Sequence, residues 1–272
     1  MVRNKLGQIY VSIFERMLTN SKWFNPWLTF YLNIRCVPLR QAFKFPVFVY
    51  GCPKLYSTFG HLRFPEKCYP GMVHFNESVP GGPQCEVGNS ELDLWGTLIF
   101  RGKCTIGTSN KINVGHGATL DIGAYTKITI LCNVTAYGKI VIGHHSWIVH
   151  RCQVLDTNFH FVADFRHEGF GRVHPMARPI LIGNYCWICN STTVTGGAVI
   201  PNKTMVASNS LVSKDLSSIP EESLVGGIPA KLLSHGFRRV EKSEREIFDY
   251  FKLHPDALFF EFPIERKADF VG

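Results

Sequence analysis

Aliphatic residues recur at every sixth position through much of the second half of this 272-residue chain. The longest run begins at Ile182 and continues through Ile188, Val194, Ile200, Val206 and Val212. A period of six fits neither the 3.6-residue turn of an α-helix nor the two-residue alternation of a strand. It fits a short strand followed by a tight turn, with one β-branched side chain per unit facing inward. One such unit cannot bury its own apolar face, so the pattern predicts a stack of units, a β-helix.

The same spacing occurs earlier in the chain, and the predicted repeat therefore spans about residues 106–214. The earlier positions are Ile106, Ile112, Ile122, Ile128, Val134 and Ile140. The period then shifts by two residues and continues through Ile142, Ile148 and Val154. A β-sandwich with regularly spaced short strands is the alternative, but it does not require equal steps of six.

The rest of the chain is expected to surround an all-β domain. Residues 1–100 are predicted to form a capping region, with an amphipathic helix over residues 1–20 and irregular strands over 33–100. Residues 101–233 are predicted to form the β-helix, interrupted by a polar loop at 161–178. Residues 234–272 are expected to form a helical tail. A long loop in a regular stack is often functional.

Residues 23–32 are strongly apolar, but Pro26 interrupts them and they are too short to cross a bilayer. One interpretation is that this segment caps the open end of the β-helix. The other is a peripheral contact of its aromatic side chains with a membrane surface, assisted by Lys22, Arg35 and Arg40.

Charge and cysteine content restrict the class of partner and the compartment. The formal net charge is +8, and this favours anionic partners. Lys and Arg are scattered, so a phosphorylated small molecule is expected and a nucleic acid is not. Nine cysteines, an odd number spread along the chain, indicate a reducing cytoplasm and no disulfide scaffold. No signal peptide is expected.

Four segments resemble the hexapeptide-repeat O-acetyltransferases, which include maltose, galactoside and capsular or surface-polysaccharide acetyltransferases. They are LDTNFHF at 155–161, ILIGNYCWICNSTTV at 180–194, VIPNKTMVASNSLVSKD at 199–215 and GGIPAKLL at 226–233. The resemblance implies a left-handed parallel β-helix and a homotrimer with active sites between adjacent subunits. It also implies acetyl-CoA as co-substrate and a sugar or polysaccharide hydroxyl as acceptor.

His160 matches the catalytic histidine of this family, and a histidine suits the removal of a proton from the acceptor hydroxyl near neutral pH. Such a base usually needs a carboxylate to orient its other ring nitrogen. Asp156 is the first candidate, with Glu168 and Asp164 as the next ones. An equally weighted interpretation of Asp156 is a turn residue whose side chain bonds its own backbone.

The resemblance also implies a site for acetyl-CoA. Asn190 matches a position near the pantetheine arm, and Ser208 matches a segment whose backbone contacts CoA. Ser213 and Lys214 match a Thr-Lys pair of the family, and Lys231 matches the cation of its Gly-x-Pro-Ala-Lys motif. Two cations suit a ligand with several phosphate charges.

Other functions stay open at this point. A γ-class carbonic anhydrase shares the fold but needs three histidines on zinc, and its usual histidine segments are absent. A non-catalytic β-helix could serve as a scaffold. The pair Cys186 and Cys189 has the spacing of a redox or zinc motif, but it lies in a repeat strand, and no metal is expected.

Overall fold

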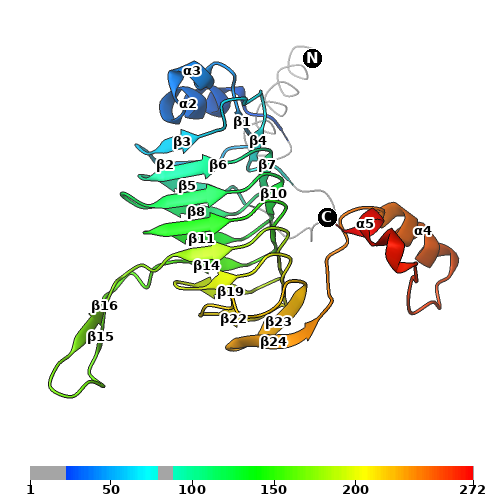
Figure 1. The fold of residues 1–272 in the computed structure, drawn as a ribbon. Coiled ribbons are helices and arrows are strands. Elements are labelled where there is room, and N and C mark those ends of the chain that lie inside the picture. The colour runs from blue at the N-terminus through cyan, green and yellow to red at the C-terminus, as the bar shows by residue number, and fades with distance from the viewer. Residues whose placement is uncertain (1–22, 79–87, 272) are drawn as a thin grey trace, which may run out of the picture.

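The computed structural model describes residues 23–78 and 88–271, and the helix predicted for residues 1–20 lies outside them. The chain winds into a three-sided coil, with helices at its N-terminal end and a helical segment near its C-terminus (Figure 1). Parallel strands dominate and helices are few, so the predicted left-handed parallel β-helix is confirmed.

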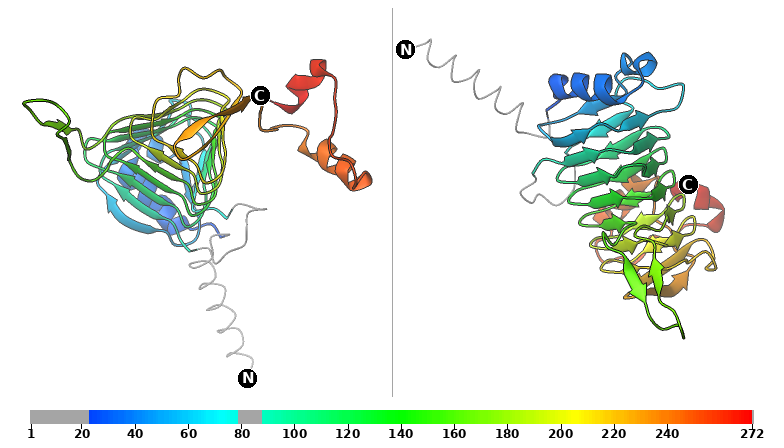
Figure 2. Two further views of the ribbon diagram at one scale, coloured as in Figure 1. Left: turned by 90° about the horizontal axis from the view of Figure 1, so that it is seen from below. Right: turned by 90° about the vertical axis from the view of Figure 1, so that its left-hand side faces the viewer.

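Each side of the coil is one sheet, and every turn of the chain adds one strand to each sheet (Figure 2). The first sheet contains β1 (Val47–Val49), β4 (Val73–Phe75), β7 (Cys104–Ile106), β10 (Thr126–Ile128), β13 (Trp147–Ile148), β18 (Trp187–Ile188), β21 (Met205–Val206), β23 (Ser223–Gly227) and β24 (Ala230–His235). The second contains β2 (Lys54–Thr58), β5 (Glu91–Leu94), β8 (Lys111–Val114), β11 (Asn133–Ala136), β14 (Gln153–Leu155), β19 (Thr193–Thr195) and β22 (Leu211–Val212). The third contains β3 (His61–Arg63), β6 (Thr97–Phe100), β9 (Thr119–Ile122), β12 (Lys139–Ile142), β17 (Ile180–Ile182) and β20 (Val199–Ile200).

The six-residue positions form the core of this coil. In the first sheet Ile148 pairs with Ile188, which pairs with Val206. Val194 pairs with Val212 in the second sheet, and Ile182 pairs with Ile200 in the third sheet. All of these side chains are buried, so each sheet contributes one column of aliphatic side chains to the interior.

The two-residue shift in the repeat has a local explanation. Ile142 pairs with Ile122, and Ile140 pairs with Leu120, so both isoleucines of β12 occupy core positions. Their side chains point to the same side of the strand because they are two residues apart. The extra residues lengthen the strands, since β11 and β12 have four residues each and only residues 137–138 separate them, and the stack continues without a break in pairing.

The coil begins before the region in which the period is visible in the sequence. Strands β1 to β6 place parts of residues 47–100 in the same three sheets, hydrogen-bonded to the later strands. The strands expected for residues 33–100 begin only at Val47, and the expectation is wrong for residues up to Ala42, which are mostly helical. The strands that do form are the first turns of the coil, and unequal connections between them hide the period.

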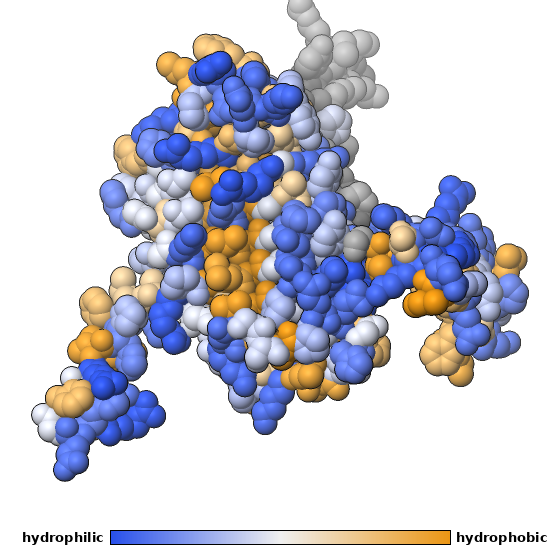
Figure 3. All heavy atoms as spheres, viewed as in Figure 1, coloured by the Kyte–Doolittle hydropathy of each residue, from blue (hydrophilic) through white to orange (hydrophobic). Residues whose placement is uncertain are grey.

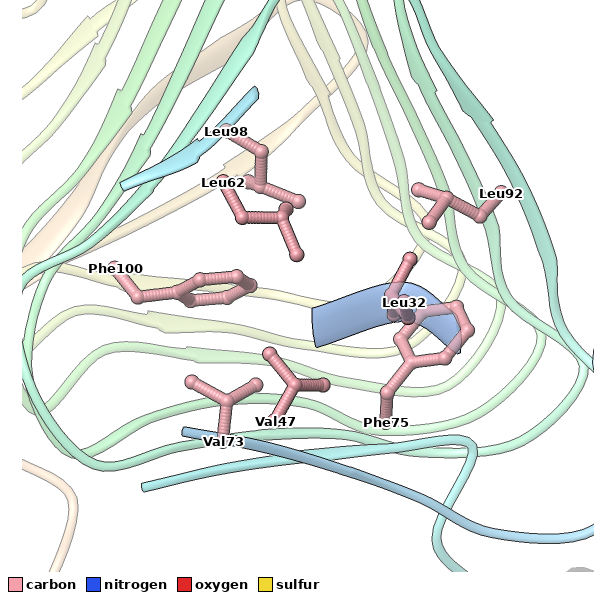
Figure 4. A pocket seen from close by; sticks show the side chains of 8 residues that line it. All are labelled: Leu32, Val47, Leu62, Val73, Phe75, Leu92, Leu98 and Phe100. Carbon is pink, nitrogen blue, oxygen red and sulfur yellow. The ribbon is translucent and has the colours of Figure 1, made fainter. Parts of the chain in front are cut away.

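Helices α2 (Pro26–Cys36) and α3 (Leu39–Ala42) cover the N-terminal end of the coil. Asn25 starts α2 by accepting a hydrogen bond from the backbone N–H of Leu28, and Pro26 suits the first turn. Leu32 then points into the coil towards Val47, where only a small void of about 10 Å³ remains (Figure 4). The prediction that this segment caps the open end is confirmed.

The predicted loop 161–178 contains an antiparallel hairpin of β15 (Val162–Asp164) and β16 (Arg172–His174). The hairpin leaves the coil after β14 and projects away from it (Figure 1). Its large apolar side chains are exposed: Phe161, Phe165, Phe170 and Val173.

The C-terminal segment follows β24. Arg239 packs its guanidinium 4.0 Å from the ring centroid of Trp147 on the first sheet and pairs with Glu241 at 3.2 Å. The chain then forms α4 (Glu244–Leu253), η1 (Ile264–Arg266) and α5 (Lys267–Phe270), which lie beside the coil (Figure 2). Helix α4 lies within residues 234–272, for which the sequence predicts a helical tail. No helix among residues 23–78 and 88–271 has the length and apolar character needed to cross a membrane.

Candidate active site

Three rows of turns join the sheets and form the edges of the coil. We call the row between the second and third sheets the hairpin edge, because the β15–β16 hairpin leaves from it. The row between the first and second sheets is the Asn190 edge, since Asn190 lies in one of its turns. The row between the third and first sheets is the tail edge, where Arg239 donates to the backbone oxygen of His145.

His160 lies on the hairpin edge, in the short segment between β14 and the hairpin. Its side chain is exposed. The described part of the chain gives its ring no hydrogen-bond partner, so an approaching molecule can reach the imidazole. The preceding residue, Phe159, has a positive φ of 59° and packs its ring against Tyr137 at 5.4 Å between centroids. This contact fixes the chain where the His160 segment turns away from the coil.

Asp156 is buried four residues before His160, but its carboxylate faces the preceding turn of the coil. One oxygen accepts the backbone N–H of Tyr137 at 2.7 Å and the other accepts that of Gly138 at 2.8 Å. Burial raises the pKa of Asp156, and the two N–H donors oppose this shift. The carboxylate of Asp156 therefore bonds the backbone of the turn at 137–138 and not the ring of His160. The role of Asp156 in orienting His160 stays a prediction.

The other two candidate acids lie in the hairpin segment. Asp164 accepts hydrogen bonds from Arg166, including one of 2.7 Å to a guanidinium nitrogen, and these lower the pKa of Asp164 to about 2. Glu168 lies at the tip, between the two strands. Neither carboxylate is bonded to His160 within the described residues.

The residues predicted to bind acetyl-CoA divide between two edges. Asn190 and Ser208 lie in stacked turns of the Asn190 edge. The backbone N–H of Asn209 donates to the backbone oxygen of Asn190 at 3.0 Å. Lys231 pairs with Gly226 across the β23–β24 turn. The N–H of Gly227 in this turn donates to Ser210 Oγ at 3.1 Å, so Lys231 belongs to the same edge.

Ser213 and Lys214 follow β22 and lie on the hairpin edge, the one that carries His160. Lys214 and Lys231 are both exposed. Neither is paired with a carboxylate among residues 23–78 and 88–271. Unpaired exposed ammonium groups suit phosphate binding, so these residues fit a ligand such as CoA. The second sheet lies between the two edges, and its strands there are only two or three residues long.

The cysteine pair of the repeat is placed for packing. Cys186 is fully buried, and its thiol donates to the backbone oxygen of Pro201 at 3.1 Å. Burial raises the pKa of Cys186 to about 12 and that of Cys189 to about 11. Both side chains are therefore thiols at neutral pH, a state that neither binds metal well nor acts as a nucleophile.

Histidines also meet on the tail edge, away from His160. His144 and His145 approach within 3.0 Å through their Nδ1 atoms, beside a hollow of about 410 Å³ that Tyr125 also lines. No group of three or more His, Cys, Asp or Glu side chains within the described ranges is arranged to hold a metal ion.

The curated proteins that are similar to this chain include two from Escherichia coli (strain K12). The chain is 27% identical over 154 residues to the protein named lipopolysaccharide biosynthesis O-acetyl transferase WbbJ, covering 50% of this chain and 77% of that one. It is 25% identical over 199 residues to galactoside O-acetyltransferase, covering 69% and 85%. No protein-family profile matches the chain.

Among solved structures, the polySia-specific acetyltransferase NeuO matches with a TM-score of 0.43 and 19% identity, over 80% of this chain and 91% of that one. The acyltransferase activity predicted from the sequence is confirmed by these two relatives, which are both named O-acetyltransferases.

The hydrogen bonds of Asp156 generate a prediction. In Asp156→Ala, the N–H groups of Tyr137 and Gly138 lose their acceptors, so we expect a loss of about 1–3 kcal/mol in the free energy of unfolding. Thermal and urea unfolding measure this loss. Asp164→Ala is the matched control, and it should leave the melting temperature unchanged because Asp164 bonds only within the exposed hairpin. An Asp156→Ala protein of wild-type stability without activity would show instead that the carboxylate acts on His160.

Proposed function

We propose that this protein transfers an acetyl group from acetyl-CoA to a hydroxyl of a sugar or polysaccharide precursor. The observation that carries the proposal is the similarity of the chain, over 154 and 199 residues, to two proteins named as O-acetyltransferases. The reaction takes place in the cytoplasm, and the free thiols of the described cysteines suit that reducing compartment.

His160 is the general base of the proposed reaction. Its imidazole accepts the proton of the acceptor hydroxyl while that oxygen attacks the thioester carbonyl carbon. The tetrahedral intermediate collapses, the carbon–sulfur bond breaks, and the imidazolium returns the proton to the departing thiolate. The products are an acetyl ester and CoA. Both substrates are held together, so no acyl-enzyme is needed.

The remaining predicted residues bind and position. Asn190 and Ser208 bind the pantetheine arm, while Lys214, next to Ser213, and Lys231 bind phosphate groups. Asp156 contributes by holding the turn at 137–138 against the segment from which His160 projects.

The enzyme acts as a homotrimer. A cyclic trimer joins two different surfaces of the chain at every interface. His160 and Lys231 lie on two different edges of the coil, which supports a site that combines the hairpin edge of one subunit with the Asn190 edge of the next.

His160→Ala should lower kcat for acetyl transfer by roughly 10²–10⁴-fold with an unchanged melting temperature, because the side chain is exposed and the general base is lost. The assay is CoA release from acetyl-CoA with a galactoside acceptor. His254→Ala, an exposed histidine of the tail, serves as control and should keep wild-type activity. A His160→Ala enzyme that is as active as wild type would remove His160 from the mechanism.

The helical cap binds the surface of an anionic membrane. Trp27, Phe30 and Phe43 are 75%, 53% and 70% exposed on α2 and on the turn after α3. Apolar side chains are visible on the cap at the top of Figure 3. No Asp or Glu occurs from Trp23 to Pro65, where five Lys and Arg residues occur. Lys54 lies 3.9 Å from the carboxylate of Glu91, and the other four cations have no such ion pair within the described residues. Exposed aromatic rings beside these cations suit a headgroup layer of acidic lipid.

Co-sedimentation with vesicles tests this contact. The protein should bind vesicles that contain phosphatidylglycerol and not vesicles of phosphatidylcholine alone. The double variant Trp27→Ser/Phe43→Ser should lose most of this binding. Phe248→Ser, at an equally exposed position of α4, should retain it. Equal binding of the double variant and wild type would contradict the assignment.

A further inference from the structure

A strip of exposed rings follows the hairpin edge from the helical cap to His160. The rings come from successive turns of the coil: Phe59, Trp95, His116, Tyr137 and Phe159. We call these five residues the ring strip. Figure 2 (right) faces the side of the molecule from which the hairpin projects.

Three of the four steps along the strip are contacts between rings. Phe59 and Trp95 lie 5.2 Å apart between centroids, and Trp95 and His116 lie 5.3 Å apart with planes inclined by 30°. Tyr137 covers Gly115, the neighbour of His116, and then contacts Phe159. Phe159 directly precedes His160, so the strip ends at the candidate catalytic residue.

The turns of this edge are built to bring the rings together. Phe59, Trp95 and Tyr137 are each followed by a glycine. A Cβ at Gly60 would collide with the backbone oxygen of Gly96, so only glycine lets successive turns approach this closely.

Water still reaches these rings. Phe59 is 65% exposed and Phe159 is 48% exposed. A row of five exposed rings along one edge is unusual on the surface of a protein and indicates a binding surface.

Polar groups lie beside the strip on the second sheet. Asp93 and Asn113, each two or three residues before a ring of the strip, line a hollow of about 310 Å³ together with Glu91, Asn133 and Thr135. The surface therefore offers an apolar strip with hydrogen-bonding carboxylates and amides along one side.

A glycan chain matches both parts of this surface. Sugar rings have an apolar face of C–H groups, which packs on aromatic rings, and a rim of hydroxyls that suits carboxylates and amides. A second protein chain matches less well as the occupant of the strip, because a stable interface buries about 800 Å² per partner and needs a broad apolar centre. The strip is only one side chain wide at each turn. The trimer proposed above requires the neighbouring subunit only at the His160 end of this edge.

We infer that the ring strip is an extended binding site for the acceptor, which is a glycan chain of several sugars whose modified hydroxyl lies at His160. This inference rests on the proposed acetyl transfer and adds the size of the acceptor to it. The strip binds sugars that are not themselves modified, so it acts on the affinity for long acceptors and leaves the transfer step unchanged.

Acceptor kinetics with two strip variants test the inference. Trp95→Ala and Phe59→Ala are compared with wild type and with Tyr125→Ala, an exposed ring of the tail edge that contacts His145. The acceptors are methyl galactoside and a panel of purified bacterial polysaccharides with their oligosaccharides of increasing length. Both strip variants should raise KM about tenfold for long acceptors. Neither kcat nor the KM values for methyl galactoside and acetyl-CoA should change, and Tyr125→Ala should resemble wild type.

Two further readouts separate the possible failures. Retardation of the protein in gels that contain each polysaccharide measures binding without chemistry, and light scattering measures the oligomeric state. Retardation of wild type but not of Trp95→Ala supports the glycan site even where acetyl transfer fails. A wild-type KM for every acceptor in both strip variants, no retardation by any polysaccharide, or dissociation of the oligomer on substitution would overturn it. Dissociation would identify the strip as a subunit contact.

Discussion

The structure depends on three columns of β-branched side chains that meet inside the coil. Each column passes from strand to strand through parallel pairs such as Ile148 with Ile188 and Val194 with Val212. A shift of one residue would expose a whole set of these side chains to water, so the register is strongly determined. The core therefore uses only the inward positions of each six-residue unit, such as Ile180 and Ile182, and leaves the outward residues and the turns free for other purposes.

The freedom of the turns explains the position of the candidate site. An insertion between β14 and β17 produces the hairpin without disturbing the pairs on either side, since Ile142 still pairs directly with Ile182. His160 lies at the base of this insertion, on a row of turns whose spacing the core fixes. A rigid stack thus supports an exposed segment, and the same row of turns carries the rings that lead from the cap towards His160.

The sequence predicted the core well because each core position depends only on residues six apart. It located His160 by motif, and the structure places that residue at the expected loop. It could not reveal the partners of Asp156, because the amides of Tyr137 and Gly138 belong to the preceding turn of the coil. The early turns were missed as part of the repeat because their connections differ in length. The ring strip was missed for the same reason, although aromatic–glycine pairs at residues 59, 95 and 137 signal it.

The central claim is that one active site combines His160 of one subunit with the Asn190 edge of its neighbour. Co-expression of His160→Ala subunits with Lys231→Glu subunits, followed by purification of the mixed oligomer through two different tags, tests it most directly. Each variant alone should be nearly inactive. The mixed oligomer should regain acetyl transfer, because some interfaces then combine an intact His160 with an intact Lys231. Mixed oligomers no more active than either parent would contradict a shared site and require His160 and Lys231 to act within one chain or in separate processes.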